Sequence, residues 1–318
     1  MTSIKSANIH ITNRCNYRCK FCFSSDRGCA CMPNMPAEFW KGRIEDLVIR
    51  RGIEKINFAG GEPLLYPGLL ECVRYAKSLG ATTSVVTNGS LADLRFFREF
   101  HDCLDWIGVS IDSTDDYTEV VLGRHAAGCR HLENAKVVSD YARDYEIGLK
   151  LNVTVNRLCI DEDFHEIIAR MDPLRVKFIQ VSWVPGMNDA PYHDLSITEA
   201  TFGSFKDRHS GIVLSSGCSP VFETESLVYN SYLMLDCRGN VRINTENGYR
   251  AVDYWEYWSD PCGHSVDLEK YIERGALYDW NLRGEGVYRV QRGKYHKMSL
   301  YPSVHPPRIR QKPWYIQY

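Results

Sequence analysis

Three closely spaced cysteines near the start of the chain, Cys15, Cys19 and Cys22, are the residues best suited to chemistry. A cubane iron–sulfur cluster normally takes four thiolates, one for each iron. Three thiolates in one short loop therefore hold three irons and leave the fourth open. An open coordination position is what separates a catalytic metal site from a structural one. The spacing thus indicates a 4Fe–4S cluster with one iron available to a substrate or cofactor.

Zinc is the main alternative for this loop. Zinc also accepts Cys-x2-Cys pairs, and Cys29 and Cys31 lie near enough in sequence to complete a tetrahedral site. No histidine accompanies these cysteines, and no second Cys-x2-Cys pair occurs in the chain. A disulfide framework is disfavoured because the chain is long and has no secretory signal. We favour the cluster and expect Cys29 and Cys31 to be free thiols without an assigned role.

Composition indicates a soluble globular enzyme. The 318 residues suffice for a well-buried core, as one barrel-type domain with an extension. The hydrophobic fraction of 44% and the charged fraction of 25% are ordinary. A net charge of −2 gives no reason to expect nucleic acid as a partner, and no apolar run is long enough to cross a membrane. Twelve cysteines without a signal peptide predict a reducing, cytoplasmic location.

The loop must be positioned by the elements around it, and the chain alternates strand and helix patterns. Six strand–helix repeats favour parallel pairing with right-handed crossovers, and an incomplete (β/α)6 barrel fits them. Loops at the carboxyl ends of such strands carry function, and the cysteine loop follows the first strand. The expected partial barrel covers residues 1–210, and a C-terminal extension, residues 211–318, closes over the site. The expected strands are 8–12, 55–59, 82–87, 106–111, 148–155 and 177–183, and the expected helices include 37–51, 67–79, 131–145 and 162–171.

A second motif, Gly60-Gly61-Glu62-Pro63, follows the second expected strand. Two glycines let the backbone approach a ligand closely, and the glutamate can accept hydrogen bonds from a cationic amine. Such a run alone is more often a plain turn. Directly after a strand and a cysteine loop, the combination is far more specific than either part.

The two motifs together, with Phe21 just before the last cysteine, resemble the radical S-adenosylmethionine (SAM) superfamily. In that superfamily the open iron binds the amino and carboxylate groups of SAM, and an electron from the cluster releases a 5′-deoxyadenosyl radical. The resemblance therefore implies a 4Fe–4S cluster, SAM and an external one-electron donor. The residues expected to bind SAM are Tyr17, Phe21, Gly60, Gly61, Glu62, Asn88, Ser110 and Arg124.

The alternation of polar and apolar residues along two expected strands indicates which kind of substrate could bind. On the second strand Lys55 and Asn57 alternate with apolar residues, and on the fifth Lys150 and Asn152 do the same. Lysines are seldom fully buried without a partner, so several directed into one lumen favour an anionic ligand such as a triphosphate. The alternative is lysines that snorkel to solvent at the strand starts. The alternation alone does not choose between the two.

A closer resemblance, over roughly residues 8–240, is to the viperin-like enzymes of this superfamily. It is carried by the cysteine loop and by stretches 54–63, 88–90, 112–113, 123–124, 150–152, 156–157 and 230–236. It implies conversion of a ribonucleoside triphosphate, CTP or UTP by preference, to its 3′-deoxy-3′,4′-didehydro analogue, and a role in antiviral defence. The 5′-deoxyadenosyl radical would remove the 4′ hydrogen, and the 3′ hydroxyl would leave as water. The residues expected to bind the triphosphate substrate are Lys55, Asn57, Arg124, Lys150, Asn152, Lys177 and Tyr295.

Departures from that family leave some features open. Animal members carry an N-terminal amphipathic helix for membranes, whereas this chain begins almost at the first strand, so no membrane partner is expected. The tail beyond Tyr295 differs from the family's C-terminus. One rival function is a radical SAM peptide or cofactor maturase with a second cluster, for which only Cys218, Cys237 and Cys262 remain after residue 200. Another is a non-catalytic zinc-binding module.

Overall fold

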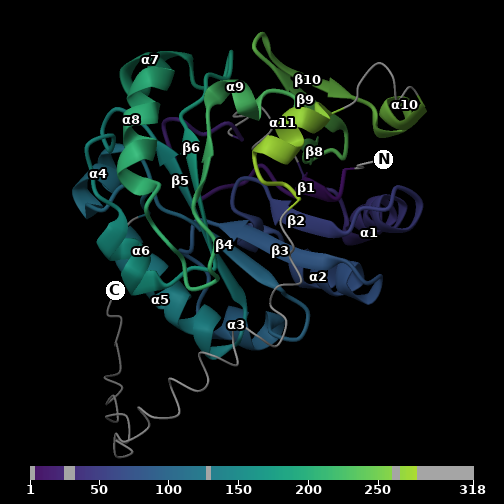
Figure 1. Cartoon of the computed structure of the whole chain (residues 1–318). Helices are drawn as coiled ribbons and strands as arrows, with labels where there is room; N and C mark the ends of the chain where they lie inside the picture. The colour runs from purple at the N-terminus through teal and green to yellow at the C-terminus, as the bar shows by residue number, and fades with distance from the viewer. Residues whose placement is uncertain (1–3, 25–32, 127–129, 260–265, 278–318) are drawn as a thin grey trace, which may run out of the picture. The chain divides into compact units, whose positions relative to one another are not determined.

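The computed structural model describes residues 4–24, 33–126, 130–259 and 266–277 (Figure 1). Cys29, Cys31, Cys262 and Tyr295 lie outside these residues. A ten-stranded sheet runs through the described part in the order β10-β9-β8-β1-β2-β3-β4-β5-β6-β7. Its strands are β1 (Ser6–His10), β2 (Lys55–Ala59), β3 (Thr82–Thr87), β4 (Trp106–Ser110), β5 (Gly148–Val155), β6 (Arg175–Gln180), β7 (Val221–Glu223), β8 (Leu233–Leu235), β9 (Val241–Thr245) and β10 (Gly248–Val252).

The first six strands form the parallel half of the sheet. Each pairs with the next in chain order, from β1 beside β2 to β5 beside β6. Helical connections return the chain between strands, as parallel pairing requires. The sheet has two edges, β10 and β7, so the barrel is not closed. The expected partial (β/α)6 barrel is confirmed.

The helices lie around the outside of the strands (Figure 1). Most lie within a few residues of their expected positions. The helix expected at 37–51 ends in a π-helical turn, and the sixth strand begins at Arg175, two residues earlier than expected. The helical elements are α1 (Ala37–Glu45), η1 (Asp46–Arg50), η2 (Pro63–Leu65), α2 (Leu69–Ser78), α3 (Leu94–Phe100), α4 (Asp116–Val121), α5 (His131–Asp144), α6 (His165–Met171), α7 (Asp189–Leu195), α8 (Glu199–His209), α9 (Glu225–Val228), α10 (Tyr254–Ser259) and α11 (Leu268–Glu273).

Residues after 210 extend the same sheet at both edges. Strand β7 pairs in parallel with β6, and β8 pairs in parallel with β1. Strands β9 and β10 follow as an antiparallel pair. The later part of the chain therefore borders the lumen from two sides. The expected domain boundary near residue 210 stays a prediction.

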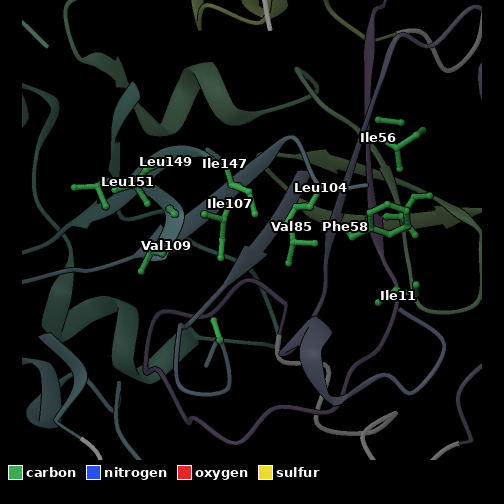
Figure 2. Packing of buried hydrophobic residues seen from close by; sticks show 14 of the residues in the cluster. Ile11, Ile56, Phe58, Val85, Leu104, Ile107, Val109, Ile147, Leu149 and Leu151 are labelled. Carbon is green, nitrogen blue, oxygen red and sulfur yellow. The ribbon is translucent and has the colours of Figure 1, made fainter. Parts of the chain in front are cut away.

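The apolar core lies between the sheet and its helices. Figure 2 shows Ile56 and Phe58 of β2 with Leu149 and Leu151 of β5 in this core, and all four are buried. Because successive side chains of a strand point to opposite faces, the lysines and asparagines between these residues face the lumen. No helix among the described residues is long and apolar enough to span a membrane.

Candidate active site

A cavity of about 270 Å³ lies in the lumen. The cysteine loop, β2, β5, β6 and the later strands all contribute to its wall. Lys55 and Glu62 are buried and stand outside the lining, and Tyr295 lies beyond the described residues. The expected site residues that line the cavity are Cys15, Tyr17, Cys19, Phe21, Cys22, Asn57, Gly60, Gly61, Asn88, Ser110, Arg124, Lys150, Asn152 and Lys177.

Gly60 and Gly61 fit the turn after β2 against the cysteine loop. Gly60 has φ +145°, a conformation that favours glycine. A Cβ on Gly60 would collide with the Thr12 carbonyl oxygen, and one on Gly61 with that of Arg14. Gly61 N–H donates to the Thr12 oxygen and Glu62 N–H to the Arg14 oxygen, both at 2.7 Å. The glycines are therefore required by close packing of two backbones.

Glu62 holds the neighbouring turn, residues 88–90. Its carboxylate accepts hydrogen bonds from the Thr87 hydroxyl at 2.7 Å and from Asn88 N–H at 2.8 Å. Burial raises the pKa of Glu62 to about 7, against the opposing effect of these bonds. The Asn88 amide in turn donates to Asn16 of the cysteine loop at 2.9 Å. Contact of Glu62 with the amine of SAM stays a prediction, since the described bonds of its carboxylate are internal.

Arg124 is the buried cation beside the cysteine loop. Its Nε donates to Asp112, and Glu119 lies 3.7 Å away. Burial alone would lower the pKa of Arg124, but Asp112, Cys19 and Glu119 hold it above its ordinary value. Burial and Asp112 raise the pKa of Glu119 to about 8. The positive charge of Arg124 is thus offset chiefly by the Asp112 carboxylate, to which it is bonded.

The three cysteines lie together in the wall of the cavity and can hold a cluster there. Burial raises the pKa of Cys15 to about 11 and that of Cys19 to about 12, so their thiolates need a strong cation to form.

At the other end of the strands lies a group that we call the cation cluster: Lys55, Lys150, Arg175, Lys177 and Arg274. Lys55 and Arg175 are the first residues of β2 and β6, and Arg274 follows α11. Burial, and then repulsion by the other cations, holds the pKa of Lys55 well below its ordinary value. The pKa of Lys150 is lowered for the same reasons.

Glu223 of β7 is the carboxylate that faces these cations. Lys177 Nζ donates to Glu223 and, at 3.1 Å, to the Tyr232 hydroxyl, which also donates to Glu223. Burial lowers the pKa of Lys177 to about 8, and Glu223 opposes that effect. The Arg274 guanidinium lies 3.6 Å from the centre of the Tyr232 ring. Glu223 thus offsets part of the positive charge of this cluster, and repulsion among its cations adds to the burial that lowers the lysine pKa values.

Sequence reasoning missed Arg175, Arg274, Glu223 and Tyr232. The signal for Arg175 was available, since it precedes Lys177 by two residues and shares its face of β6. Arg274 could not be found in this way, because only the folded chain brings α11 beside β1: the Tyr271 hydroxyl accepts a hydrogen bond from Lys5 N–H at 2.9 Å. The expected covering segment at Tyr295 lies outside the described residues.

Comparison with known proteins first identifies the superfamily. The sequence profile of the Radical SAM superfamily matches residues 9–179, more than half of the chain, so the chain belongs to that superfamily. Two solved structures share its fold. Streptococcus suis SuiB bound to precursor peptide SuiA has a TM-score of 0.61 at 14% identity and covers 92% of this chain and 67% of its own. The enzyme anSMEcpe with bound AdoMet has a TM-score of 0.60 at 14% identity and covers 87% and 86%.

Sequence relatives identify the family within this class. An S-adenosylmethionine-dependent nucleotide dehydratase of Thermoplasmatales archaeon (strain ISO4-H5) is 38% identical over 276 residues, which cover 87% of this chain and 96% of that protein. The S-adenosylmethionine-dependent nucleotide dehydratase RSAD2 of Oncorhynchus mykiss is 31% identical over 300 residues and covers 87% and 80%. The chain therefore belongs to the S-adenosylmethionine-dependent nucleotide dehydratases, the viperin-like enzymes. The superfamily uses a 4Fe–4S cluster and SAM, for which the cysteine loop offers its three thiols.

Proposed function

We propose that this enzyme dehydrates a ribonucleoside triphosphate, CTP or UTP by preference, to its 3′-deoxy-3′,4′-didehydro analogue. The observation that carries the proposal is the cavity itself, with three cluster cysteines in one part of its wall and Lys150 and Lys177 of the cation cluster in another. A peptide substrate would give no reason for so many buried cations. Relatives named nucleotide dehydratases support the reaction class. The antiviral role and the pyrimidine preference are supported by the resemblance alone.

Different residues of the chain position the cluster, SAM and the substrate. When bound, the cluster and SAM supply a 5′-deoxyadenosyl radical that can take a hydrogen atom from the sugar. Cys15, Cys19 and Cys22 would hold the cluster, and Ser110 and Arg124 would orient SAM. The cation cluster would hold the triphosphate, so that the ribose lies between the two. Such near-attack placement directs a reactive radical to one C–H bond, the 4′ position.

The departing 3′ hydroxyl needs a proton, and Lys177 with Tyr232 can supply it. Both line the cavity, and they share hydrogen bonds with Glu223. Lys177 carries a proton that it can pass to the departing hydroxyl, and the hydrogen bonds of its ammonium group to Glu223 and Tyr232 orient it. Proton delivery turns the leaving hydroxyl into water, and a second electron from the external donor completes the dehydration.

The test is an anaerobic assay of the four ribonucleoside triphosphates with SAM and a chemical reductant, followed by mass spectrometry. With substrate deuterated at C4′, deuterium should enter 5′-deoxyadenosine. The nucleotide product should be lighter than the labelled substrate by one deuterium and one hydroxyl. If all four triphosphates return unchanged while SAM is cleaved slowly, the proposal is wrong and the radical acts on another substrate.

A further inference from the structure

His131, the first residue of α5, lies behind the cavity wall and has no part in the proposed reaction. It is 2% exposed. Its ring nevertheless contacts two residues of the wall, Tyr17 of the cysteine loop and Ser110 at the end of β4. These two residues belong to different parts of the site, the cluster loop and the expected SAM pocket.

The hydrogen bonds of His131 define one form of the ring. Nε2 lies 2.8 Å from the Ser110 carbonyl oxygen, which can only accept, so Nε2 carries a hydrogen. Burial, with Arg124 as the second cause, lowers the pKa of His131 to about 3, so the ring is neutral and Nδ1 accepts. The Tyr17 hydroxyl, 3.3 Å from Nδ1, therefore donates to it. The two hydrogen bonds thus have one direction: the Tyr17 hydroxyl donates to His131 Nδ1, and His131 Nε2 donates to the Ser110 oxygen.

Tyr17 connects the position of the His131 ring to the cluster ligands, because Tyr17 lies between Cys15 and Cys19 in the loop. Its ring packs edge-on against the His131 ring, with centroids 5.6 Å apart at an interplanar angle of 72°. Tyr17 is itself 2% exposed, so both partners of the hydrogen bond are buried. Removal of the Tyr17 hydroxyl would take this donor away from the buried Nδ1 of His131, which is costly.

Ser110 connects the position of the His131 ring to the SAM pocket. The peptide after the Ser110 carbonyl leads through Ile111 to Asp112, which holds Arg124 and accepts a hydrogen bond from Thr154 N–H at 2.7 Å. Glu119 and Arg124 are the charged groups near His131, with Glu119 4.0 Å from Nε2. The loop has other ties to this region, among them the backbone hydrogen bond from Arg18 N–H to the Gly123 oxygen at 3.1 Å and the contact of the Arg124 guanidinium with the Phe21 ring at 5.8 Å.

We propose that His131 is a positioning residue that holds the cysteine loop and the end of β4 in fixed register, and so supports both cluster retention and SAM binding. An ordinary buried histidine would contribute to folding alone. The proposal rests on the cofactors of the proposed function and is independent of the nucleotide.

The experiment uses anaerobically reconstituted holoenzyme, three single variants, the double variant His131→Phe/Tyr17→Phe and one control variant. His131→Phe keeps the ring volume and removes both nitrogens, Tyr17→Phe removes one hydroxyl, and His131→Gln keeps a donor able to reach the Ser110 oxygen. His209→Phe is the matched control. His209 is 1% exposed and is also bonded at both nitrogens, to Phe164 N–H and the Phe205 oxygen, but it packs among the helices outside the sheet.

Three quantities are measured: the unfolding temperature without cluster, the rate of iron loss to a chelator, and the equilibrium affinity for SAM. Loss of a buried hydrogen bond of this kind should weaken SAM binding by His131→Phe about tenfold. Iron loss should accelerate in His131→Phe and in Tyr17→Phe, and the double variant should lose iron no faster than His131→Phe. His131→Gln should restore most of the SAM affinity but not the cluster retention.

The control separates positioning from stability. His209→Phe should lower the unfolding temperature while iron loss and SAM affinity stay at wild-type values. If His131→Phe behaves like His209→Phe in all three measurements, the proposal is overturned. It is also overturned if Tyr17→Phe, the mildest change, leaves the rate of iron loss unaltered. Since no measurement uses nucleotide turnover, a negative result here and a failure of the proposed reaction remain distinguishable.

Discussion

Lys150 gives the sharpest test of the cation cluster. Its side chain lines the cavity on β5, and Lys177, Arg175 and Arg274 are the cations around it. Replacement of Lys150 by methionine keeps the aliphatic length and removes the charge. A charge-assisted hydrogen bond contributes about 1.5–3 kcal/mol, which corresponds to a loss in affinity of roughly 10- to 150-fold. We expect Lys150→Met to weaken triphosphate binding within this range.

The same substitution should have the opposite effect on the ligand-free protein. Burial and the neighbouring cations hold the pKa of Lys150 well below 10.5 in the folded state. The unfolded chain then binds the proton more tightly, so this lysine destabilises the fold at neutral pH, and stability rises as the pH increases toward 10.5. Lys150→Met should therefore raise the unfolding temperature at pH 7 and reduce its increase with pH. Lys55 and Lys177 have lowered pKa values as well, so part of the pH dependence should persist.

The assays are equilibrium nucleotide binding, SAM binding and thermal unfolding between pH 6 and 10. Lys206→Met, an exposed lysine of α8, carries the same chemical change away from the cavity and serves as the control. SAM affinity should be unchanged in both variants. The reasoning is refuted if Lys150→Met lowers the unfolding temperature and weakens SAM and nucleotide binding equally, because the lysine would then be structural.

Three further predictions concern the two parts of the cavity. Cys19→Ala should lose both the brown colour of the cluster and SAM cleavage, whereas Cys29→Ala should keep both, as absorbance and 5′-deoxyadenosine release will show. Gly61→Ala should impair SAM binding because its Cβ would collide with the Arg14 oxygen; calorimetry with SAM tests this, and unchanged affinity would contradict it. Lys55→Ala should weaken nucleotide affinity at least about tenfold at constant SAM affinity, measured by equilibrium dialysis.

Local patterns predicted the elements and the polar face of the lumen. The alternation in β5 placed Leu149 and Leu151 in the core and Lys150 and Asn152 toward the cavity, as the structure has them. This prediction was possible because side chains alternate between the two faces of a strand, and one face must be apolar where it is buried. The spacing of the cysteines indicated a cluster for a similar reason, since its ligands come from one short loop.

Contacts between distant segments could not be predicted in that way. The approach of Arg274 to Tyr232 depends on how the chain after β8 packs, and no periodic pattern encodes it. The contact of Glu62 with SAM stays a prediction, and the sequence did not indicate that its carboxylate also bonds Thr87 and Asn88. The motif identified the right loop, whereas the hydrogen-bond partners of its glutamate are set by β3 and the turn that follows it.

The two parts of the cavity differ in how far their charges are compensated when no ligand is bound. Beside the cysteine loop, the charge of Arg124 is already paired with Asp112 within the protein. In the cation cluster, Glu223 binds Lys177, and burial together with repulsion between the cations lowers the lysine pKa values. A triphosphate would add negative charge and restore those pKa values toward normal. We therefore expect triphosphate binding to be accompanied by proton uptake near neutral pH, because lysines that are partly neutral in the free enzyme become fully charged in the complex. Calorimetry in buffers of different ionisation enthalpy measures this directly. Proton release, or no exchange at all, would show that the lysines are already charged and that some other group offsets their repulsion.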